Sequence, residues 1–305
     1  MLLLKDKLLI LCCIALSSSY LIAQQHTQFS NYLLNSITIN PAYAGSKDGT
    51  ELMATYRKQW TKIEGSPSTF SASGHSSISN SKIGISAILV HDKIGISNNL
   101  HLSLGASYRL KLNKYQLQFG LNGGVQVHNT DYSKVNTIQA DDEVFTEASN
   151  SHYSPIIGTG AFMFKDDVYF GLSSPNLIQI SENSENGAFR QKRHYYLSSG
   201  KVFTVSKIIK LKPSILIKIT KAAPVQFDFS GTAIFDDVLG VGLSYRTHAG
   251  LVWFAQFFIK EKWTIAYAYD QMTNNLSTVD GSSHEITIIR NLYKNQQTIY
   301  SPRYF

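Results

Sequence analysis

Apolar and polar residues alternate with a period of two over many short stretches of the chain. Residues 115–122, Tyr-Gln-Leu-Gln-Phe-Gly-Leu-Asn, place tyrosine, leucine and phenylalanine on one face and glutamine, glycine and asparagine on the other. Successive side chains of a β-strand point to opposite faces, so this period predicts strands. The polar face carries amides and glycine rather than salt-bridging charges. We therefore predict a β-barrel with a wet interior and an apolar outside that stands in a membrane.

The same pattern predicts about fourteen antiparallel strands of roughly the length that a tilted membrane-crossing strand needs. Their expected ranges are residues 51–59, 69–77, 82–90, 99–110, 115–128, 155–164, 168–173, 194–205, 208–220, 225–235, 238–246, 251–259, 263–270 and 283–290. The strand at 251–259 is apolar on both faces, so we expect it to pack on something inside the barrel. Helical periodicity is nearly absent, which counts against a helical transporter.

The connections alternate between tight and mostly longer links. Polar turn residues such as 113–114, 206–207 and 236–237 follow the even-numbered strands, whereas the links at 129–154, 174–193 and 271–282 follow odd-numbered strands. In outer-membrane barrels the short turns face the periplasm and the long loops face outside. An even strand count then places the N-terminal segment and the C-terminal tail together on the periplasmic side.

The first residues resemble an export signal. Lys5 and Lys7 precede an apolar run at 8–16 and a small-residue stretch that ends at Ala23. A lipoprotein reading on Cys12 is weaker, because the residue before such a cysteine is normally small. We expect four regions: a signal peptide (1–23), an N-terminal periplasmic or plug segment (24–49), the transmembrane barrel (50–290) and a C-terminal periplasmic tail (291–305). The mature chain would then contain no cysteine, since Cys12 and Cys13 both lie in the signal.

Composition narrows the classes of function. The aromatic content of 12% fits aromatic girdles at the two membrane interfaces. The formal charge of +7 comes from dispersed residues, which counts against nucleic acid and is compatible with anionic lipid or acidic partners near residues 190–194. The histidines lack metal-ligand spacing, and His101 and Ser103 lie on the polar face rather than where a phospholipase would need them. We expect no enzyme activity, no cofactor and no metal site.

Several motifs closely resemble the PorP/SprF family of Bacteroidota outer-membrane proteins, and they are spread over essentially the whole mature chain. They are Gln-Phe-Ser-Asn-Tyr at 28–32, Ile-Asn-Pro-Ala-Tyr-Ala-Gly-Ser at 39–46, Tyr-Arg-Lys-Gln-Trp at 56–60 with Gly-Ser-Pro at 65–67, Asp-Lys-Ile-Gly at 92–95, Gly-Leu-Ser-Ser-Pro-Asn-Leu at 171–177 and Ser-Pro-Arg-Tyr-Phe at 301–305. The resemblance implies a β-barrel of the type IX secretion system that works with exported proteins bearing C-terminal sorting domains. It also implies contact with periplasmic secretion or motility components.

The matched motifs supply the candidate partner-binding residues. These are Asn40, Pro41, Tyr43, Gly45, Tyr56, Arg57, Trp60, Pro67, Pro302 and Arg303. The segment before the first strand lacks the charge of a free tail, so it is predicted to fold into the lumen as a plug, with an extended periplasmic leader as the alternative. Trp60 is either a partner contact or a girdle residue like the other tryptophans. The C-terminal tail either docks on periplasmic components or on the barrel, or is a retained insertion signal.

Two functions remain open from the sequence. In the first, the protein is a non-enzymatic component of the outer membrane that receives or anchors a type IX-exported surface protein, such as a gliding adhesin, and links it to the secretion and motility machinery. In the second, it is an outer-membrane channel or uptake barrel for a hydrophobic or small solute. The N-terminal segment and the tail favour the first.

Overall fold

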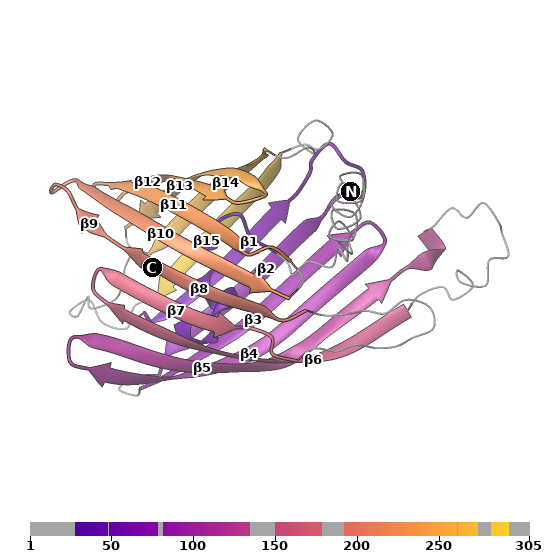
Figure 1. Ribbon diagram of the computed structural model, residues 1–305, viewed down its shortest axis with the longest axis horizontal. Coiled ribbons are helices and arrows are strands. Elements are labelled where there is room, and N and C mark those ends of the chain that lie inside the picture. Colours follow the sequence, from indigo (N-terminus) through magenta and orange to yellow (C-terminus); the bar gives the residue numbers. More distant parts are fainter. Residues whose placement is uncertain are drawn as a thin grey trace, which may run out of the picture.

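The computed structural model is a closed antiparallel β-barrel (Figure 1). It describes residues 28–47, 49–78, 82–134, 150–178, 192–221, 223–260, 262–273 and 282–292. Each strand pairs with its neighbours in the sequence, and β1 pairs with β15 to close the barrel. The expected signal peptide and the C-terminal tail lie outside the described residues.

The strands run between residues 50 and 292. Their bounds are β1 Thr50–Lys58, β2 Ser68–Ser77, β3 Ile83–Ile94, β4 Ser97–Leu112, β5 Tyr115–Thr130, β6 Asn150–Lys165, β7 Val168–Ser174, β8 His194–Lys201, β9 Phe203–Thr204, β10 Ile209–Thr220, β11 Gln226–Phe235, β12 Leu239–Arg246, β13 Gly250–Ile259, β14 Trp263–Met272 and β15 Ser283–Leu292. The prediction of about fourteen antiparallel strands is confirmed, because β8 and β9 together form one interrupted strand beside β10.

The break between β8 and β9 has a local cause in β10. Gly200 pairs with Ser214 and Phe203 pairs with Leu211, so the register continues unchanged across the break. Pro213 falls in the gap, and proline has no backbone N–H to donate to the neighbouring strand. On the opposite side, the N–H of Val202 donates to the carbonyl of Asp167, in the β6–β7 turn, at 2.7 Å, so pairing toward β7 continues through the break.

The two ends of the barrel differ in their connections. At one end, here the short-turn end, two to five residues join successive strands, as between β4 and β5 or β6 and β7. The turn between β11 and β12 contains Asp236 and Asp237, both with positive φ, as expected for a tight hairpin turn. The other end, here the long-loop end, carries the links at 59–67, 131–149, 175–193 and 273–282, together with three shorter ones. Short periplasmic turns and longer external loops are the rule for outer-membrane barrels.

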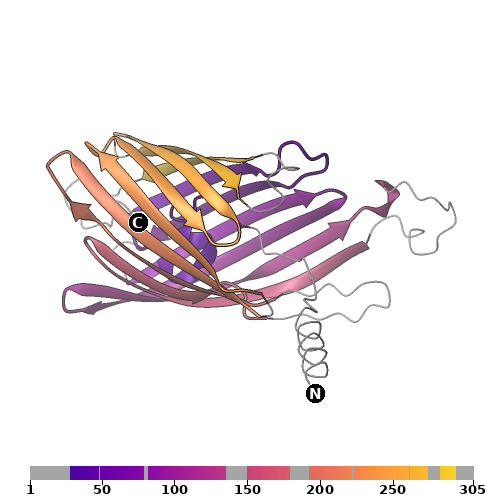
Figure 2. The same ribbon diagram turned by 45° about the horizontal axis from the view of Figure 1, so that its top comes forward.

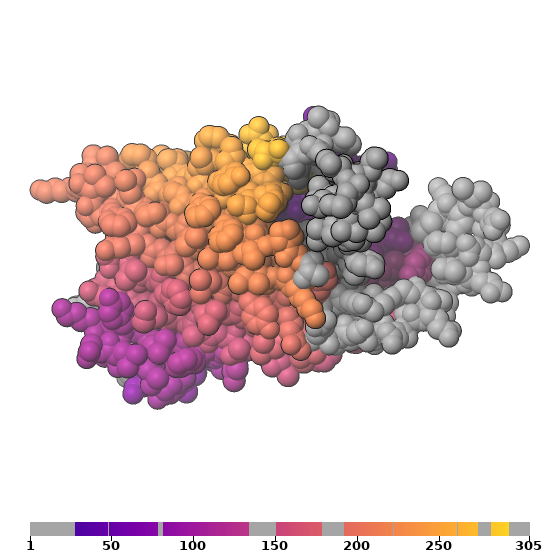
Figure 3. Space-filling model, in the orientation of Figure 1, coloured from indigo at the N-terminus to yellow at the C-terminus, as the bar shows by residue number. Residues whose placement is uncertain are grey.

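The wall has the predicted two faces. Along β1, Glu51, Met53, Thr55 and Arg57 point inward and are buried, whereas the residues between them are exposed on the outside. Outward positions throughout the barrel carry large apolar side chains, and Leu104 is 71% exposed. Figure 3 shows one outer face of the molecule, formed mostly by closely packed atoms of the second half of the chain. This apolar exterior suits contact with lipid. The polar side chains that are buried lie nearly all on the lumen side.

Residues 28–47, here the inner segment, lie inside the barrel before β1 begins. They contain the short helix α2 (Ser36–Ile39) and the 3-10 turn η1 (Pro41–Tyr43), and a second 3-10 turn, η2 (Tyr132–Lys134), follows β5. α2 ends at Asn40 because the residue before a proline avoids helical ψ, and Asn40 is extended. No helix in the described residues is long and apolar enough to span a membrane. Figure 2 shows the short violet coils of this segment between the walls of the barrel.

Candidate functional site

The inner segment runs along the lumen from one end of the barrel to the other. Its first residue, Gln28, contacts Gln226 at the long-loop start of β11, at 3.4 Å. Its last residue, Lys47, binds Glu51 at the short-turn start of β1, at 2.5 Å. Residues 28–31 therefore do not stay on the periplasmic side with the C-terminal end of the barrel, as the even strand count suggested. They reach the opposite end, where inward-facing charged side chains hold them.

The segment forms hydrogen bonds to strands on every side of the barrel. The strands that take part are β1, β2, β4, β5, β6, β7, β11, β12, β14 and β15. The remaining full-length strands, β3, β8, β10 and β13, supply residues to the apolar clusters that contain the segment. These twenty residues thus connect strands that lie far apart in the sequence.

Residues 40–45, here the anchor, lie in the half of the lumen nearer the short turns. The Asn40 side chain accepts from the N–H of Ala42 at 2.9 Å and donates to the carbonyl of Ala161, on β6, at 3.1 Å. Gly45 has a φ of +67° and donates its N–H to Nδ1 of His75 at 3.3 Å, while its carbonyl accepts from Arg109. The anchor is therefore held through main-chain and capping contacts that depend on Asn40, Pro41 and Gly45.

Three inward-facing glycines of the wall make room for the anchor. A Cβ atom on Gly84 would lie 2.1 Å from the carbonyl oxygen of Ala44, one on Gly120 would lie 2.3 Å from the nitrogen of Ala42, and one on Gly160 would lie 2.1 Å from Oδ1 of Asn40. No side chain fits at such distances. The backbone of the anchor consequently touches the backbone of the wall, which is the use of glycine where two chains approach closely.

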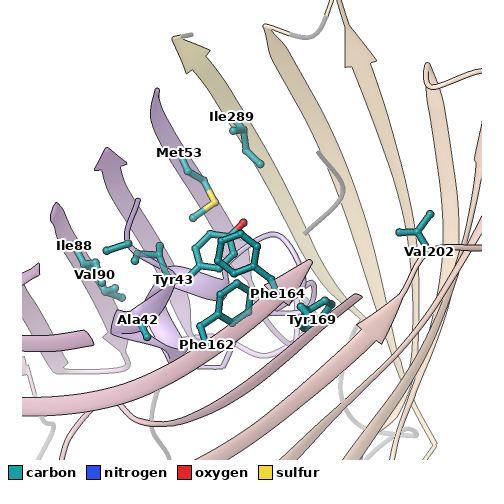
Figure 4. Close-up of a cluster of buried hydrophobic side chains, with 12 residues drawn as sticks. Ala42, Tyr43, Met53, Ile88, Val90, Phe162, Phe164, Tyr169, Val202 and Ile289 are labelled. Carbon is teal, nitrogen blue, oxygen red and sulfur yellow. The ribbon is translucent and has the colours of Figure 1, made fainter. Parts of the chain in front are cut away.

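Two apolar clusters of buried side chains contain residues of the inner segment and of the surrounding strands. In the first, Tyr43 packs edge-on against His75 and Phe162, each with ring centroids 5.3 Å apart. Figure 4 shows Tyr43 and Ala42 surrounded by side chains from strands on several sides, among them Met53 and Phe164. Tyr43 is 3% exposed, so its ring is buried among these side chains.

The second cluster explains the strand that is apolar on both faces. Val252 and Phe254 of β13 point inward and belong to the same buried cluster as Tyr32 and Leu33 of the inner segment. The expectation that residues 251–259 pack on something inside the barrel is confirmed. The outward residues of the same strand, including Trp253, face the exterior and are exposed.

Five buried charged side chains, here the charge cluster, surround the start of the inner segment near the long-loop end. They are Arg57, Asp228, Arg246, Asp270 and Glu285. Arg57 binds Asp270 at 2.6 Å and lies 3.8 Å from Glu285, and Nε of Arg246 donates to Asp228 at 2.9 Å. Buried charges of this kind persist only when they are paired and hydrogen-bonded.

The charge cluster holds the main chain of the inner segment. The carboxylate of Glu285 accepts the N–H groups of Ser30 and Asn31 at 2.6 and 3.0 Å. Arg246 donates to the carbonyls of Phe29 and Ser30 at 3.1 and 3.4 Å. Charge-assisted hydrogen bonds are the stronger ones, so these contacts fix the path of residues 29–31.

The structure separates the candidate residues of the sequence. Asn40, Pro41, Tyr43 and Gly45 come together in the anchor, and Arg57 lies in the charge cluster. Tyr56 points outward and is 51% exposed, as expected from the alternation with Arg57. Trp60, half-buried, and Pro67, buried, belong to the link between β1 and β2 at the long-loop end, where the carbonyl of Pro67 accepts from Gln59 at 2.9 Å. Pro302 and Arg303 lie outside the described residues.

Sequence reasoning missed the wall residues that hold the inner segment. The missed residues are Gly84, Gly120, Gly160, Asp228, Arg246, Asp270 and Glu285. A signal existed for each group: charged residues and glycines at inward positions of otherwise regular strands need a partner inside. The described residues hold no group of three or more histidine, cysteine or acidic side chains that could bind a metal ion. His101 and Ser103 both face the lumen, 3.2 Å apart.

The course of the inner segment predicts the accessibility of Gln28. A Gln28→Cys variant is expected to react with a membrane-impermeant maleimide on intact cells, as an exposed Lys62→Cys control on the β1–β2 link does. A Lys114→Cys control on the β4–β5 turn should react only after the outer membrane is permeabilised. Labelling of Gln28→Cys only after permeabilisation would contradict the threaded path.

The fold and its two faces define the class of the protein. A closed antiparallel barrel with an apolar exterior, a polar lumen and unequal ends is an outer-membrane β-barrel. A family model described as "Type IX secretion system membrane protein PorP/SprF" matches residues 21–289, so the chain belongs to the PorP/SprF family. The resemblance noted in the sequence motifs is thereby confirmed.

Other comparisons give more distant likenesses. The outer membrane protein Omp33 of Acinetobacter baumannii is 8% identical over 81% of this chain and 100% of its own, with a TM-score of 0.47. The KdgM porin, in complex with disordered oligogalacturonate, is 10% identical over 80% of this chain and 99% of its own, with a TM-score of 0.40. A mutant Rh. blastica porin is 7% identical, with a TM-score of 0.35 and the same coverages. No curated protein matches the chain.

Proposed function

We propose that the protein is a non-enzymatic platform of the type IX secretion system in the outer membrane. In this role it receives or anchors an exported surface protein with a C-terminal sorting domain, such as a gliding adhesin, and links it to periplasmic secretion or motility components. Membership of the PorP/SprF family supports a role in secretion. The apolar exterior supplies the contact with outer-membrane lipid.

The inner segment is the observation that carries the proposal beyond the family. Its residues make hydrogen bonds to opposite walls and belong to two apolar clusters that occupy the lumen around it. An open diffusion channel needs a continuous aqueous path, and the contacts of the inner segment with strands around the lumen support a plug across that path. The arrangement favours a plugged barrel that works through its two ends over a channel or uptake barrel for small solutes.

The ends of the barrel fit this role. At the long-loop end, links of nine residues or more join several strands, and loops of this kind commonly carry binding residues on a rigid scaffold. At the short-turn end, β1 begins and β15 ends, so both the inner segment and residues beyond 292 connect to the barrel there. We infer that cargo contacts the first end and the secretion machinery the second.

Co-purification from the native membrane tests the proposal. Affinity-tagged protein, extracted in mild detergent, is expected to retain a large exported surface protein and a periplasmic component. A matched control carries the same tag on an unrelated outer-membrane barrel. Recovery of the protein alone, together with a ligand-dependent conductance, would overturn the proposal in favour of the channel.

A further inference from the structure

The charge cluster binds the inner segment almost entirely through the main chain. Glu285 takes two successive N–H groups, and Arg246 takes two successive carbonyls. Among the described residues, two side chains of the inner segment also take part: the Ser30 hydroxyl donates to Asp270 at 2.9 Å, and the Tyr32 hydroxyl donates to the main-chain carbonyl of Asp228 at 3.3 Å. The Asn31 amide is buried, yet neither of its polar atoms has a hydrogen-bond partner among the described residues. The cluster thus contacts the main chain of residues 29–31, which bends at Ser30, more than particular side chains.

Contacts within the wall position much of the charge cluster. Arg57 and Glu285 are direct cross-strand neighbours on β1 and β15, and Asp228 and Arg246 are direct neighbours on β11 and β12. Asp270 is fixed by its 2.6 Å contact with Arg57. Side chains on paired strands are positioned by the sheet, and opposite charges across a pair stabilise one another. The sheet therefore positions these charged side chains before a peptide binds to them. This preorganisation lowers the free-energy cost of binding.

Glu285 depends most on the peptide. Within the described residues, its contacts other than Ser30 and Asn31 reduce to Nη1 of Arg57 at 3.8 Å, beyond hydrogen-bonding distance. A buried carboxylate without donors is costly. Removal of the inner segment leaves this carboxylate ready to accept the N–H groups of another chain.

We propose that the charge cluster is a binding site for the main chain of a bent peptide, occupied in cis by residues 29–31. In trans the ligand is a peptide with the same chemistry: an aromatic residue, a small hydroxyl residue and an amide residue in succession. The exported protein is the source of such a segment, and in this respect the inference rests on the proposed function. The inner segment then acts as an internal competitor for the cargo.

A peptide-binding experiment tests the site. The full chain without residues 28–35 keeps the anchor, and its probe is a fluorescein-labelled peptide with the sequence of residues 28–35. Fluorescence anisotropy is expected to show saturable binding to this deletion variant in detergent micelles and at least tenfold weaker binding to the intact chain. A Glu285→Gln change in the deletion variant should weaken binding at least tenfold.

Backbone recognition has its own control peptide. Methylation of the backbone nitrogens of Ser30 and Asn31 removes both N–H donors and leaves every side chain in place, so this peptide is expected to bind at least tenfold more weakly. Equal binding of the methylated peptide, or no saturable binding to the deletion variant, would overturn the inference.

A second variant tests the same site if the deletion variant does not insert into the membrane. The full chain with Ser30→Pro and Asn31→Pro lacks the same two N–H groups, and it is expected to bind the unmethylated peptide where the intact chain does not. The difference in gel mobility between unheated and heated samples, which marks a folded barrel, confirms insertion of each variant. Co-purification of cargo with the intact chain tests the proposed function separately, so the two can fail independently.

Discussion

Replacement of Arg57 by alanine is expected to lower the free energy of unfolding by about 3–5 kcal/mol, the usual cost of removing one partner of a buried ion pair. Arg57 is 4% exposed and lies between Asp270 and Glu285. Its loss leaves two buried carboxylates without their shared cation. Urea unfolding in detergent micelles or bilayers, followed by tryptophan fluorescence, measures the change.

An exposed ion pair provides the matched control for Arg57. Lys201 lies 3.8 Å from Asp167, and both side chains are about half exposed. A Lys201→Ala change is expected to cost less than about 1 kcal/mol, because water screens exposed pairs. Equal losses for Arg57→Ala and Lys201→Ala would show that the charge cluster does not stabilise the barrel as described.

A Gly120→Val change is expected to cost about 3 kcal/mol or more, at the upper end of the usual range for overpacking. The new Cβ atom would lie 2.3 Å from the Ala42 nitrogen and 2.4 Å from the Pro41 carbonyl carbon, so the anchor must move. The same urea unfolding assay measures the loss, and raised protease sensitivity of the inner segment would report its displacement.

Gly231 offers the matched control on the outside of the barrel. A Cβ atom there meets nothing within 4 Å, and the residue is exposed. Gly231→Val is expected to be neutral or slightly stabilising, since valine suits strands better than glycine. An equal loss for the two glycines would mean that the effect comes from the strand backbone and that the anchor plays no part.

The sequence predicts the barrel well because successive residues of each strand alternate between the lumen and the exterior, and this alternation gives the period of two. Fourteen strands with alternating faces follow from the pattern, and the apolar inner face of β13 even indicates that something lies within. The ends of β4, β5 and β6 were predicted too short. These strands reach sixteen residues each through polar stretches such as 150–154, which precede the predicted start at 155 and pair with β5.

The site is harder to predict because its parts lie far apart in the sequence. Arg57 and Glu285 meet only through closure of β1 on β15, and the exact register of that pair decides which side chains face each other. Periodicity shows that Arg57 points inward but does not show its partner. The sequence likewise shows the glycines that make room for the anchor, but it does not show what approaches them. The chain that approaches them comes from a segment without strand periodicity.

The conductance of the intact protein tests the central claim most directly, namely that the protein's own inner segment closes the barrel. The purified full chain is reconstituted into planar lipid bilayers, with an open porin as the positive control. Folded, inserted protein is expected to show no steady open level. A stable, ohmic conductance from the intact chain, similar to that of the porin, would contradict it.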